Sequence, residues 1–302
     1  MTQEVLRTPE ERFASLPDYP YTPHYLQNSS AGGLRQHYID ARPEGGPGQP
    51  GVVLCLHGEP TWAFLYRRMI PVFTRAGHRV VAPDWFGFGR SDKPVDDRWY
   101  SFGQHRRSML AFIEAMDLRD ITLVVQDWGG LLGLTLPMEM PERFSRLLVM
   151  NTCLATGAPI SPGFDAWRAY ANANPDMAVG PLMKRATPIL TEAEVAAYDA
   201  PFPDQRYKAG VRRFPQMVMT SPEMEGADIS RHAVQWWWQA WRGQTFMAVG
   251  AQDPVLGPPV MEQLRSQIRG CPSPMIIPDA GHFVQEWGAP VAEHALATFA
   301  RG

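Results

Sequence analysis

The amino-acid sequence predicts an α/β protein with a mostly parallel central sheet, helices on both faces of that sheet, and an inserted helical cap. The first observation is that short, continuously apolar runs alternate with segments of helical periodicity along most of the chain. Such runs are typical of parallel strands that are buried on both faces. The second observation is that one internal segment contains helical pieces but no apolar run of this kind, so it interrupts the alternation.

Six apolar runs predict the strands of the sheet, because each is short and is bounded by turn-forming residues. They are Val52–Leu56, Arg79–Ala82, Ile121–Val125, Leu147–Met150, Phe246–Val249 and Met275–Ile277. Helical patterns lie between them, for example at Phe102–Met116 and Val260–Ile268. The glycine- and proline-rich segment Pro43–Gly51 is expected to form a loop before the first of these strands.

The interrupting segment is rich in proline, methionine, alanine and aromatic residues, with short helical pieces such as Glu192–Tyr198. We therefore expect a core domain formed by residues 1–155 and 227–302 and a helical cap domain at 156–226. The cap is expected to lie over the carboxyl ends of the strands, where open α/β sheets bind ligands. The tryptophan-rich run at 236–241 is expected to be a helix packed between cap and core, because aromatic residues dominate core burial.

Composition and charge give no indication of a nucleic-acid or membrane partner. The chain has 302 residues, and its formal net charge is 28 − 31 = −3, so no basic surface is expected. The most apolar long stretch, Ile121–Leu136, contains Gln126 and Asp127 and is too short to span a bilayer. The N-terminal residues include no apolar run of the kind that a signal peptide requires.

The cysteines favour a reducing compartment. Cys55, Cys153 and Cys271 are an odd number and have no metal-binding spacing, so a disulfide framework is not expected. We therefore expect a cytoplasmic protein, and we expect it to be a monomer.

The segment that carries most chemical information joins the strand Ile121–Val125 to the start of a helix. Its sequence is ITLVVQDWGG, in which an apolar strand ends at a polar residue and small residues follow. Hydrolases of the α/β-hydrolase fold hold their nucleophile, usually the serine of G-x-S-x-G, at such a strand-turn-helix junction. Asp127 occupies that position here, and Gly129 and Gly130 allow the helix to approach the strand. The alternative is that Asp127 only caps the helix.

Partners for Asp127 follow in the chain order of this fold, which is nucleophile, acid, histidine. Asp253 follows the strand at 246–249, and His282 follows the strand at 275–277. As alternatives, Asp253 could be a turn residue and His282 a loop histidine. Asn151 also follows a strand, but an amide cannot stabilise an imidazolium as a carboxylate does. Asp279 is interpreted as a turn residue.

The loop after the first parallel strand reads HGEPTW, and in this fold such a loop supplies a backbone N–H to the oxyanion hole. That donor is expected to be Glu59, with Trp128 as the second. His57 could be a second base, but orienting the loop by hydrogen bonds is the commoner use of such a residue. The glycine-rich segment Val81–Ser91 contains no lysine and is interpreted as a structural turn.

Five segments together resemble the haloalkane dehalogenases. They read HGEPTWAFLYRRM, APDWFGFGRSDKP, VVQDWGG, GQTFMAVGAQDPVLG and DAGHFVQEWG. The similarity covers Tyr25 to Ala300, includes Gly163–Trp167 and Ala200–Tyr207, and is greatest to the subgroup typified by the bacterial 1,2-dichloroethane dehalogenase. The resemblance implies the α/β-hydrolase fold and the hydrolysis of small haloalkanes to a primary alcohol and halide.

The resemblance also implies roles for individual residues. Asp127 resembles the nucleophile, His282 the base and Asp253 the acid. Trp128 and Trp167 resemble the pair whose indole N–H groups hold the halide, and the backbone N–H groups of Glu59 and Trp128 resemble the oxyanion hole. The positions that match the substrate pocket are Phe164, Phe214, Val218 and Leu256.

An aspartate nucleophile suits this chemistry, because attack on saturated carbon gives an ester that water can cleave, whereas a serine would give an ether. The expected partners are a small halogenated alkane, water and halide, with no metal or organic cofactor. An epoxide hydrolase with the same nucleophile remains an alternative, with Tyr170, Tyr198 or Tyr207 as proton donor. Further alternatives are a fluoroacetate-type dehalogenase, which would need an arginine beside Asp127, and a ligand receptor without turnover.

Overall fold

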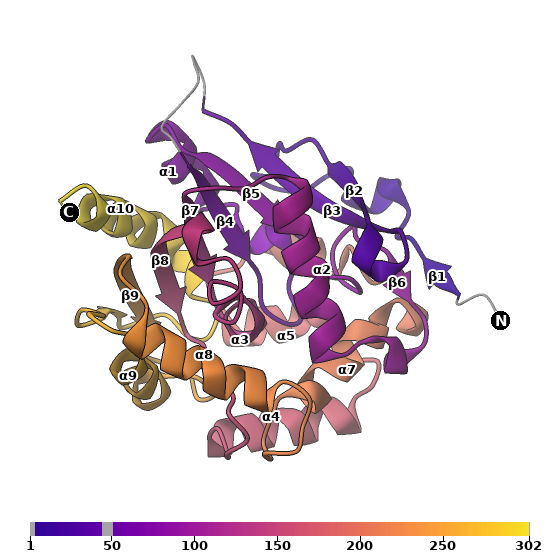
Figure 1. Ribbon diagram of the computed structural model, residues 1–302. Coiled ribbons are helices and arrows are strands. Elements are labelled where there is room, and N and C mark those ends of the chain that lie inside the picture. The colour runs from indigo at the N-terminus through magenta and orange to yellow at the C-terminus, as the bar shows by residue number, and fades with distance from the viewer. Residues whose placement is uncertain (1–3, 44–50, 302) are drawn as a thin grey trace.

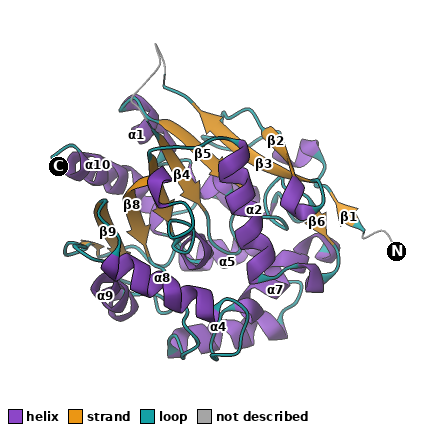
Figure 2. Ribbon diagram, in the orientation of Figure 1, coloured by secondary structure: helices purple, strands orange, loops and turns teal. Residues whose placement is uncertain are grey.

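An eight-stranded sheet runs through the centre of the protein, and helices flank it (Figures 1 and 2). The computed structural model describes residues 4–43 and 51–301, so most of the expected loop Pro43–Gly51 lies outside the described residues. The strand order is β10-β9-β8-β7-β4-β5-β3-β2. The strands from β10 to β5 are parallel to their neighbours, and β3 and β2 are antiparallel at one edge. The predicted fold class, an α/β protein with a mostly parallel sheet, is confirmed.

All six predicted strands are present in the parallel part of the sheet. They are β4 (Val52–Leu56), β5 (Arg79–Pro83), β7 (Ile121–Val125), β8 (Phe144–Met150), β9 (Gln244–Gly250) and β10 (Met275–Ile277). Every residue of β4 and β7 is buried, as expected for central strands that are covered on both faces. The carboxyl ends of β4 and β7 are adjacent, because these two strands pair directly in parallel.

The antiparallel strands β2 (His24–Asn28) and β3 (Leu34–Ala41) were not predicted from the sequence. The reason is that polar residues of these strands are buried and replace the apolar signal: Asn28, Gln36 and His37 are each about 1% exposed. They are satisfied by hydrogen bonds, such as the one that Asn28 Nδ2 donates to Gln36 Oε1 over 2.8 Å. A separate pair of two-residue strands, β1 (Val5–Leu6) and β6 (Lys93–Pro94), is too short to leave a pattern.

Helices cover the sheet in groups that pack on one another. Helix α1 (Ile70–Arg75) contacts α10 (Gly288–Phe299), and α2 (Phe102–Ala115) contacts α3 (Trp128–Gly133). Helix α8 (Ala227–Gln239) contacts α9 (Pro258–Gln267). Among the described residues, no helix is long and apolar enough to cross a membrane.

Besides the short 3-10 helix at Gln205–Lys208, four α-helices and no strand lie between β8 and α8, a stretch that is described in full. They are α4 (Pro162–Ala173), α5 (Val179–Ala186), α6 (Glu192–Asp199) and α7 (Ala209–Met217). Helix α6 begins with a capping box, in which Thr191 and Glu194 satisfy each other's backbone N–H groups. In Figure 1 these helices lie at the end of the sheet opposite α1. The boundaries of the cap at 156–226 stay a prediction.

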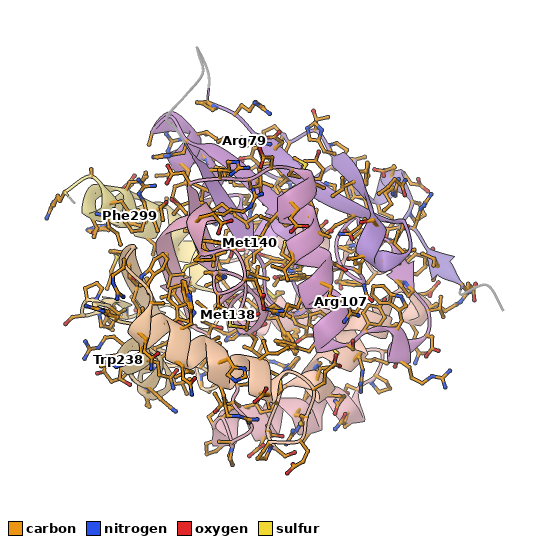
Figure 3. The ribbon with its side chains drawn as sticks, in the orientation of Figure 1. Arg79, Arg107, Met138, Met140, Trp238 and Phe299 are labelled. Carbon is orange, nitrogen blue, oxygen red and sulfur yellow. The ribbon has the colours of Figure 1, made fainter. Side chains whose placement is uncertain are left out.

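The tryptophan-rich run belongs to α8 and its C-terminal end, and its members differ in burial. Trp237 is fully buried, and its indole N–H donates to the Leu134 carbonyl over 2.7 Å. Trp236 and Trp241 pack against it. Trp238 is instead 59% exposed and lies at the surface (Figure 3). Because a helix turns through about 100° per residue, three consecutive side chains cannot all face the core.

Candidate active site

Asp127 sits at a strained turn between β7 and α3. Its φ of 51° and ψ of −125° are unusual for a residue with a side chain, and such backbone strain is concentrated at functional sites. Hydrogen bonds to its own main chain hold it: its N–H donates to the Asn151 carbonyl over 2.9 Å, and its carbonyl accepts from Gly130 N–H and from the side-chain hydroxyl of Thr152. A Cβ atom on Gly129 would lie 1.9 Å from a carbonyl oxygen of β4, so this glycine permits the close approach of α3.

The structure brings Asp127, His282 and Asp253 together, although they come from three separate loops. His282 Nε2 lies 3.5 Å from Asp127 Oδ2, and its Nδ1 lies 2.8 Å from Asp253 Oδ2. Asn151 supports Asp253 rather than replacing it, because its Nδ2 donates to Asp253 Oδ2 over 2.8 Å. The N–H of Val255 donates to the other oxygen of Asp253, also over 2.8 Å.

The pKa values of the acid and the histidine move in opposite directions. Burial by itself would raise the pKa of Asp253, but the charge of His282 and three hydrogen bonds hold that pKa below its ordinary value. Burial by itself would lower the pKa of His282, but the Asp253 and Asp127 carboxylates outweigh it and raise this pKa from 6.5 to about 10. The arrangement therefore stabilises an imidazolium between two carboxylates.

The loop after β4 places a hydrogen-bond donor on the Asp127 carboxylate. The backbone N–H of Glu59 donates to Asp127 Oδ1 over 2.7 Å. Trp128, the first residue of α3, follows the nucleophile directly in the chain. The side chain of Glu59 is buried, and burial together with the nearby Asp127 charge raises its pKa well above the usual range. The raised pKa disfavours a second negative charge beside Asp127.

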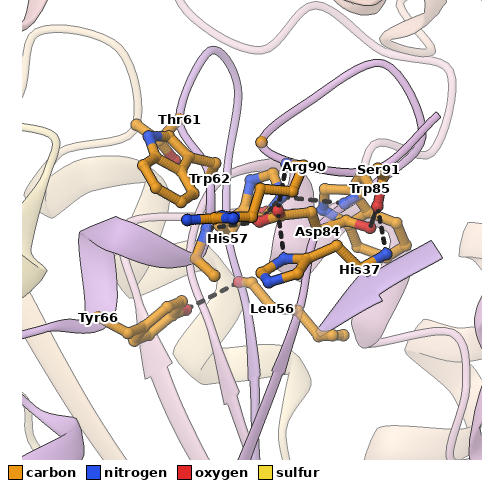
Figure 4. Close-up of polar contacts among 12 residues, drawn as sticks. His37, Leu56, His57, Thr61, Trp62, Tyr66, Asp84, Trp85, Arg90 and Ser91 are labelled. Atoms are coloured by element: carbon orange, nitrogen blue, oxygen red, sulfur yellow. Dashed lines mark hydrogen bonds and ion pairs between the residues drawn. The ribbon is translucent and has the colours of Figure 1, made fainter. Parts of the chain in front are cut away.

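His57 orients this loop (Figure 4). Its Nε2 accepts from Trp85 N–H over 3.1 Å, which leaves its Nδ1 to donate to the Gly58 carbonyl over 2.9 Å. Burial lowers the pKa of His57 despite the nearby Asp84 carboxylate. Asp84 in turn accepts from His37 Nδ1 over 2.7 Å. With both ring nitrogens occupied, His57 has the contacts of an orienting residue rather than of a second base.

A cavity of about 550 Å³ opens above the Asp127 carboxylate, and we call it the active-site cavity. Its floor includes Asp127, Glu59 and His282 at the ends of the strands. Its other walls come largely from the inserted helices and from apolar side chains near them. They include Phe164, Leu182, Arg185, Pro215, Val218 and Leu256. The cavity therefore lies between the sheet and the inserted helices, and its size is typical of a small-molecule site.

Trp128 and Trp167 both line the active-site cavity, and they come from different layers. Trp128 belongs to α3, is 2% exposed and packs on Phe214, with ring centroids 4.7 Å apart. Trp167 belongs to α4 and stacks on Tyr170. Within residues 4–43 and 51–301, neither indole N–H donates to a protein acceptor. Both donors are thus available to a small anion.

Three of the four pocket residues expected from the sequence, Phe164, Val218 and Leu256, line the active-site cavity. Phe214 does not, and here the structure differs from the expectation. Phe214 is fully buried behind Trp128, where it also packs on Phe88 and His105. Its neighbour Pro215, inside α7, lines the cavity instead.

Sequence reasoning overlooked the polar residues that support the site, chiefly Gln126 and Gln285. Both are fully buried, and Gln126 Nε2 donates to the His282 carbonyl over 3.1 Å. The available signal was a polar residue at the end of the apolar run Ile121–Val125. Among the described residues, no group of three or more histidine, cysteine, aspartate or glutamate side chains could hold a metal ion.

Comparisons with known proteins agree with this fold. The model of the alpha/beta hydrolase fold family matches residues 51–289. A haloalkane dehalogenase from Psychrobacter cryohalolentis is 42% identical over 94% of this chain and 93% of its own. One from Mycolicibacterium paratuberculosis is 42% identical over 97% of each chain. The structure of the haloalkane dehalogenase DpaA from Paraglaciecola agarilytica, described as tetrameric, has a TM-score of 0.93 and 50% identity, covering 98% of this chain and 99% of that one.

The resemblance that the five sequence segments indicate is therefore confirmed over nearly the full length of the chain. The family match spans the strand-turn-helix junction at Asp127, the loop after β4 and the segments that carry Asp253 and His282. The chain belongs to the haloalkane dehalogenases of the alpha/beta hydrolase fold.

Proposed function

We propose that this protein hydrolyses small haloalkanes to an alcohol and halide through an ester on Asp127. The observation that carries the proposal is the position of the Asp127 carboxylate. It lies at the floor of a largely apolar cavity, within 3.5 Å of His282 Nε2 and with two indole groups in the cavity lining. The same cavity offers a binding place for an apolar substrate, a base, and donors for a leaving anion.

In the first step, Asp127 Oδ2 attacks the carbon that bears the halogen, and the carbon–halogen bond breaks as the ester bond forms. Oδ1 is the oxygen held by Glu59 N–H, so it becomes the carbonyl oxygen of the ester. The departing halide takes the bonding electrons and is received by the indole N–H groups of Trp128 and Trp167. A hydrogen bond to a charged group contributes about 1.5–3 kcal/mol, so two donors lower the barrier by roughly 3–6 kcal/mol.

In the second step, His282 Nε2 takes a proton from a water molecule, whose oxygen attacks the carbonyl carbon of the ester. Asp253 holds the ring through Nδ1 and stabilises the imidazolium that forms. The backbone N–H groups of Glu59 and Trp128 hold the negative charge on the former Oδ1. Collapse of this intermediate releases the alcohol and restores the Asp127 carboxylate. The products are alcohol, halide and one proton, and these two steps use no metal or organic cofactor.

The active-site cavity supports substrates longer than two carbons. Its volume of about 550 Å³ is on the order of eighteen times the ~30 Å³ that one water molecule occupies in the liquid. Chain length is therefore limited by the inserted helices α4, α5 and α7 rather than by the nucleophile. We propose residues 156–226 as the cap that carries these helices.

The epoxide hydrolase alternative is not favoured. That reaction needs an acid that protonates an alkoxide, and a tyrosine hydroxyl is the usual donor. No tyrosine is found among the described residues that line the active-site cavity. Tyr198 is buried elsewhere and donates its hydroxyl to Glu286.

Two further expectations remain proposals. The relative from Paraglaciecola agarilytica is described as tetrameric, whereas we expect a monomer. Analytical ultracentrifugation of this chain measures its oligomeric state. A cytoplasmic location is likewise an expectation from the cysteine content.

The variant His282→Gln tests the proposed function. It keeps the nucleophile and both indoles but lacks the base, so it should release about one halide per enzyme from a bromoalkane and then stop. Intact-mass measurement should find the alkyl group on the protein, on the peptide that contains Asp127. Steady multiple turnover by this variant, or release of halide without a mass increase, would contradict the proposal. The wild-type protein, assayed in parallel on chloroalkanes, bromoalkanes and an epoxide, should release halide and leave the epoxide unchanged.

A further inference from the structure

Among the described residues, backbone hydrogen bonds tie the loop of His282 to other segments only before the histidine itself, where Gln252 N–H donates to the Ala280 carbonyl over 2.9 Å. His282 lies on the loop after β10, a three-residue strand at the edge of the sheet. The next residue, Phe283, has φ −92° and ψ 69°, and Val284 N–H donates across it to the His282 carbonyl over 3.1 Å. This is an inverse γ-turn, a tight local turn that does not tie the loop to the sheet. The position of the imidazole therefore depends on contacts from elsewhere.

One such contact comes from the residue that precedes the nucleophile. Gln126 is fully buried, and its Nε2 donates to the His282 carbonyl over 3.1 Å across 156 positions of the chain. Its Oε1 accepts from Gln285 Nε2 over 3.3 Å, so the amide is held at both ends. Gln285 also reaches the hydroxyl of Tyr66, over 3.5 Å.

The same amide also packs on the loop that carries Glu59. A Cβ atom added to Gly58 would lie 2.8 Å from Gln126 Oε1 and 2.6 Å from Asp127 Oδ1. The Gln126 side chain thus contacts both the loop that carries His282, which we call the base loop, and the loop that carries Glu59. Gln126 also directly precedes Asp127 in the chain. A buried amide with both ends satisfied is a rigid spacer, because any displacement leaves a buried polar group unpaired.

We propose that Gln126 is a positioning residue that keeps the His282 imidazole within reach of the Asp127 ester. The inference rests on the proposed function, because it assigns His282 to the second step only. Loss of the Gln126 contact should therefore slow hydrolysis of the ester and leave its formation almost unchanged. A displacement of about 1 Å at a reacting group can cost on the order of 100-fold in rate.

The test is Gln126→Met, which keeps the length of the side chain and removes both hydrogen bonds. Rapid-quench measurement of the first turnover should give ester formation within about threefold of wild type. The steady-state rate should fall by about 10- to 100-fold, and intact mass should find the ester on most of the enzyme during turnover. An equal loss in both steps, or an unchanged ratio of the two rates, would overturn the proposal.

Gln36→Met is the matched control. Gln36 is also a buried amide, but it lies in β3 and contacts Asn28 and the Asp84 carbonyl rather than the base loop. This variant should lose stability and keep the wild-type ratio of the two rates. If Gln126→Met does not fold, Gln285→Met removes the bond that holds Gln126 Oε1 and should shift the ratio in the same direction by a smaller factor.

The outcome for Gln126 can be separated from the outcome for the proposed function. If His282→Gln traps no ester, the proposed function fails and the ratio for Gln126→Met has no meaning. If His282→Gln traps the ester while Gln126→Met and Gln285→Met both keep the wild-type ratio, only the positioning role is lost.

Discussion

Asp127, the proposed nucleophile, and His282, the proposed base, are placed in different ways. Asp127 follows β7, a central strand between β4 and β8, and main-chain hydrogen bonds fix its strained turn. His282 follows the edge strand β10, and side chains distant in sequence hold it, namely Asp253 at the ring and Gln126 at the carbonyl. Main-chain bonds therefore place Asp127 directly, whereas the position of His282 depends mainly on side chains from other segments.

A charged network extends the support of the base toward the inserted helices. Glu286, four residues after His282, forms a bidentate ion pair with Arg67, with N–O distances of 2.6 and 2.7 Å. Arg67 also contacts Glu194 of α6 over 2.6 Å, and Tyr198 of the same helix donates to Glu286. Glu286 thus ties the segment after His282 to α6 by charge, whereas Trp128, next to Asp127, reaches the inserted helix α7 by packing on Phe214.

The largest expected effect is at the nucleophile. Asp127→Ala removes the group that both steps need, so no halide should be released even in a single turnover. By analogy with loss of a nucleophile in other covalent enzymes, kcat should fall by roughly 10⁴- to 10⁶-fold. Stopped-flow halide detection and intact mass provide the measurement. His282→Gln is the paired variant, because it should retain one equivalent of halide release; a similar burst from Asp127→Ala would break the comparison.

Next in size is the effect on stability of breaking the network on the base side. Arg67→Met removes the fully buried one of the two arginines that pair with Glu286 and Glu194, because Arg68 also contacts these carboxylates, over 3.0 and 2.6 Å. Removing one member of a buried ion pair costs about 3–5 kcal/mol, and because Arg68 still compensates part of the charge, the free energy of unfolding in urea should fall by at most that amount. Arg67 is 2% exposed, which means that solvent does little to screen the loss.

Arg98→Met is the matched control for Arg67→Met. Arg98 pairs with Asp96 at the surface, where its side chain is 90% exposed, so the free energy of unfolding should hardly change. Equal urea midpoints for the two variants would show that the buried network does not hold the base loop to α6.

Halide affinity should fall when either indole of the active-site cavity is removed, that of Trp128 in the core or that of Trp167 in the inserted helices. Trp128→Phe and Trp167→Phe each remove one donor, and a bond to a charged group contributes about 1.5–3 kcal/mol. The dissociation constant for bromide, followed by tryptophan fluorescence quenching, should rise by about tenfold or more for each variant. Trp238→Phe serves as control because Trp238 is exposed on α8. A normal dissociation constant in Trp167→Phe would restrict halide binding to the core side.

The difference between the two regions also decides what the sequence alone could predict. The turn at Asp127 could be predicted, because a central strand that ends in a sharp turn appears in the sequence as an apolar run followed by a polar residue and glycines. Asp253 and His282 could be placed at the same edge of the sheet, since each follows a strand. Gln126 and Glu286 could not be assigned, because their partners lie 156 and 219 positions away and leave no periodic signal.

Two further failures have a similar cause. Strand β3 was overlooked because Gln36 and His37 are buried through hydrogen bonds to specific partners, which no hydrophobic pattern reports. Phe214 was expected to line the active-site cavity, but its position behind Trp128 depends on how α7 packs on the core. Both features are set by tertiary packing rather than by local sequence.

The smallest expected effect concerns the pKa of His282. Burial disfavours its imidazolium, but the carboxylates of Asp253 and Asp127 outweigh this and raise the pKa from 6.5 to about 10. Because the folded-state pKa lies above the unfolded one, the charged ring stabilises the fold fully below about pH 6.5, and this contribution is lost as pH rises toward 10. Asp127→Asn removes one of the two charges, so the pKa of His282 should fall. As the pH is raised, the stability contributed by the charged ring should then be lost at a lower pH than in the wild type.

NMR titration of the His282 ring and urea unfolding between pH 6 and pH 10 measure both effects. Formation of the ester neutralises Asp127 just as the amide does, so the same fall in pKa would free the imidazole to accept a proton from water when the second step requires it. Asp253 alone would then hold the ring through Nδ1. A His282 that titrates identically in wild type and Asp127→Asn would mean that the base does not sense the nucleophile, and that the two sides of the site are independent in charge as well as in support.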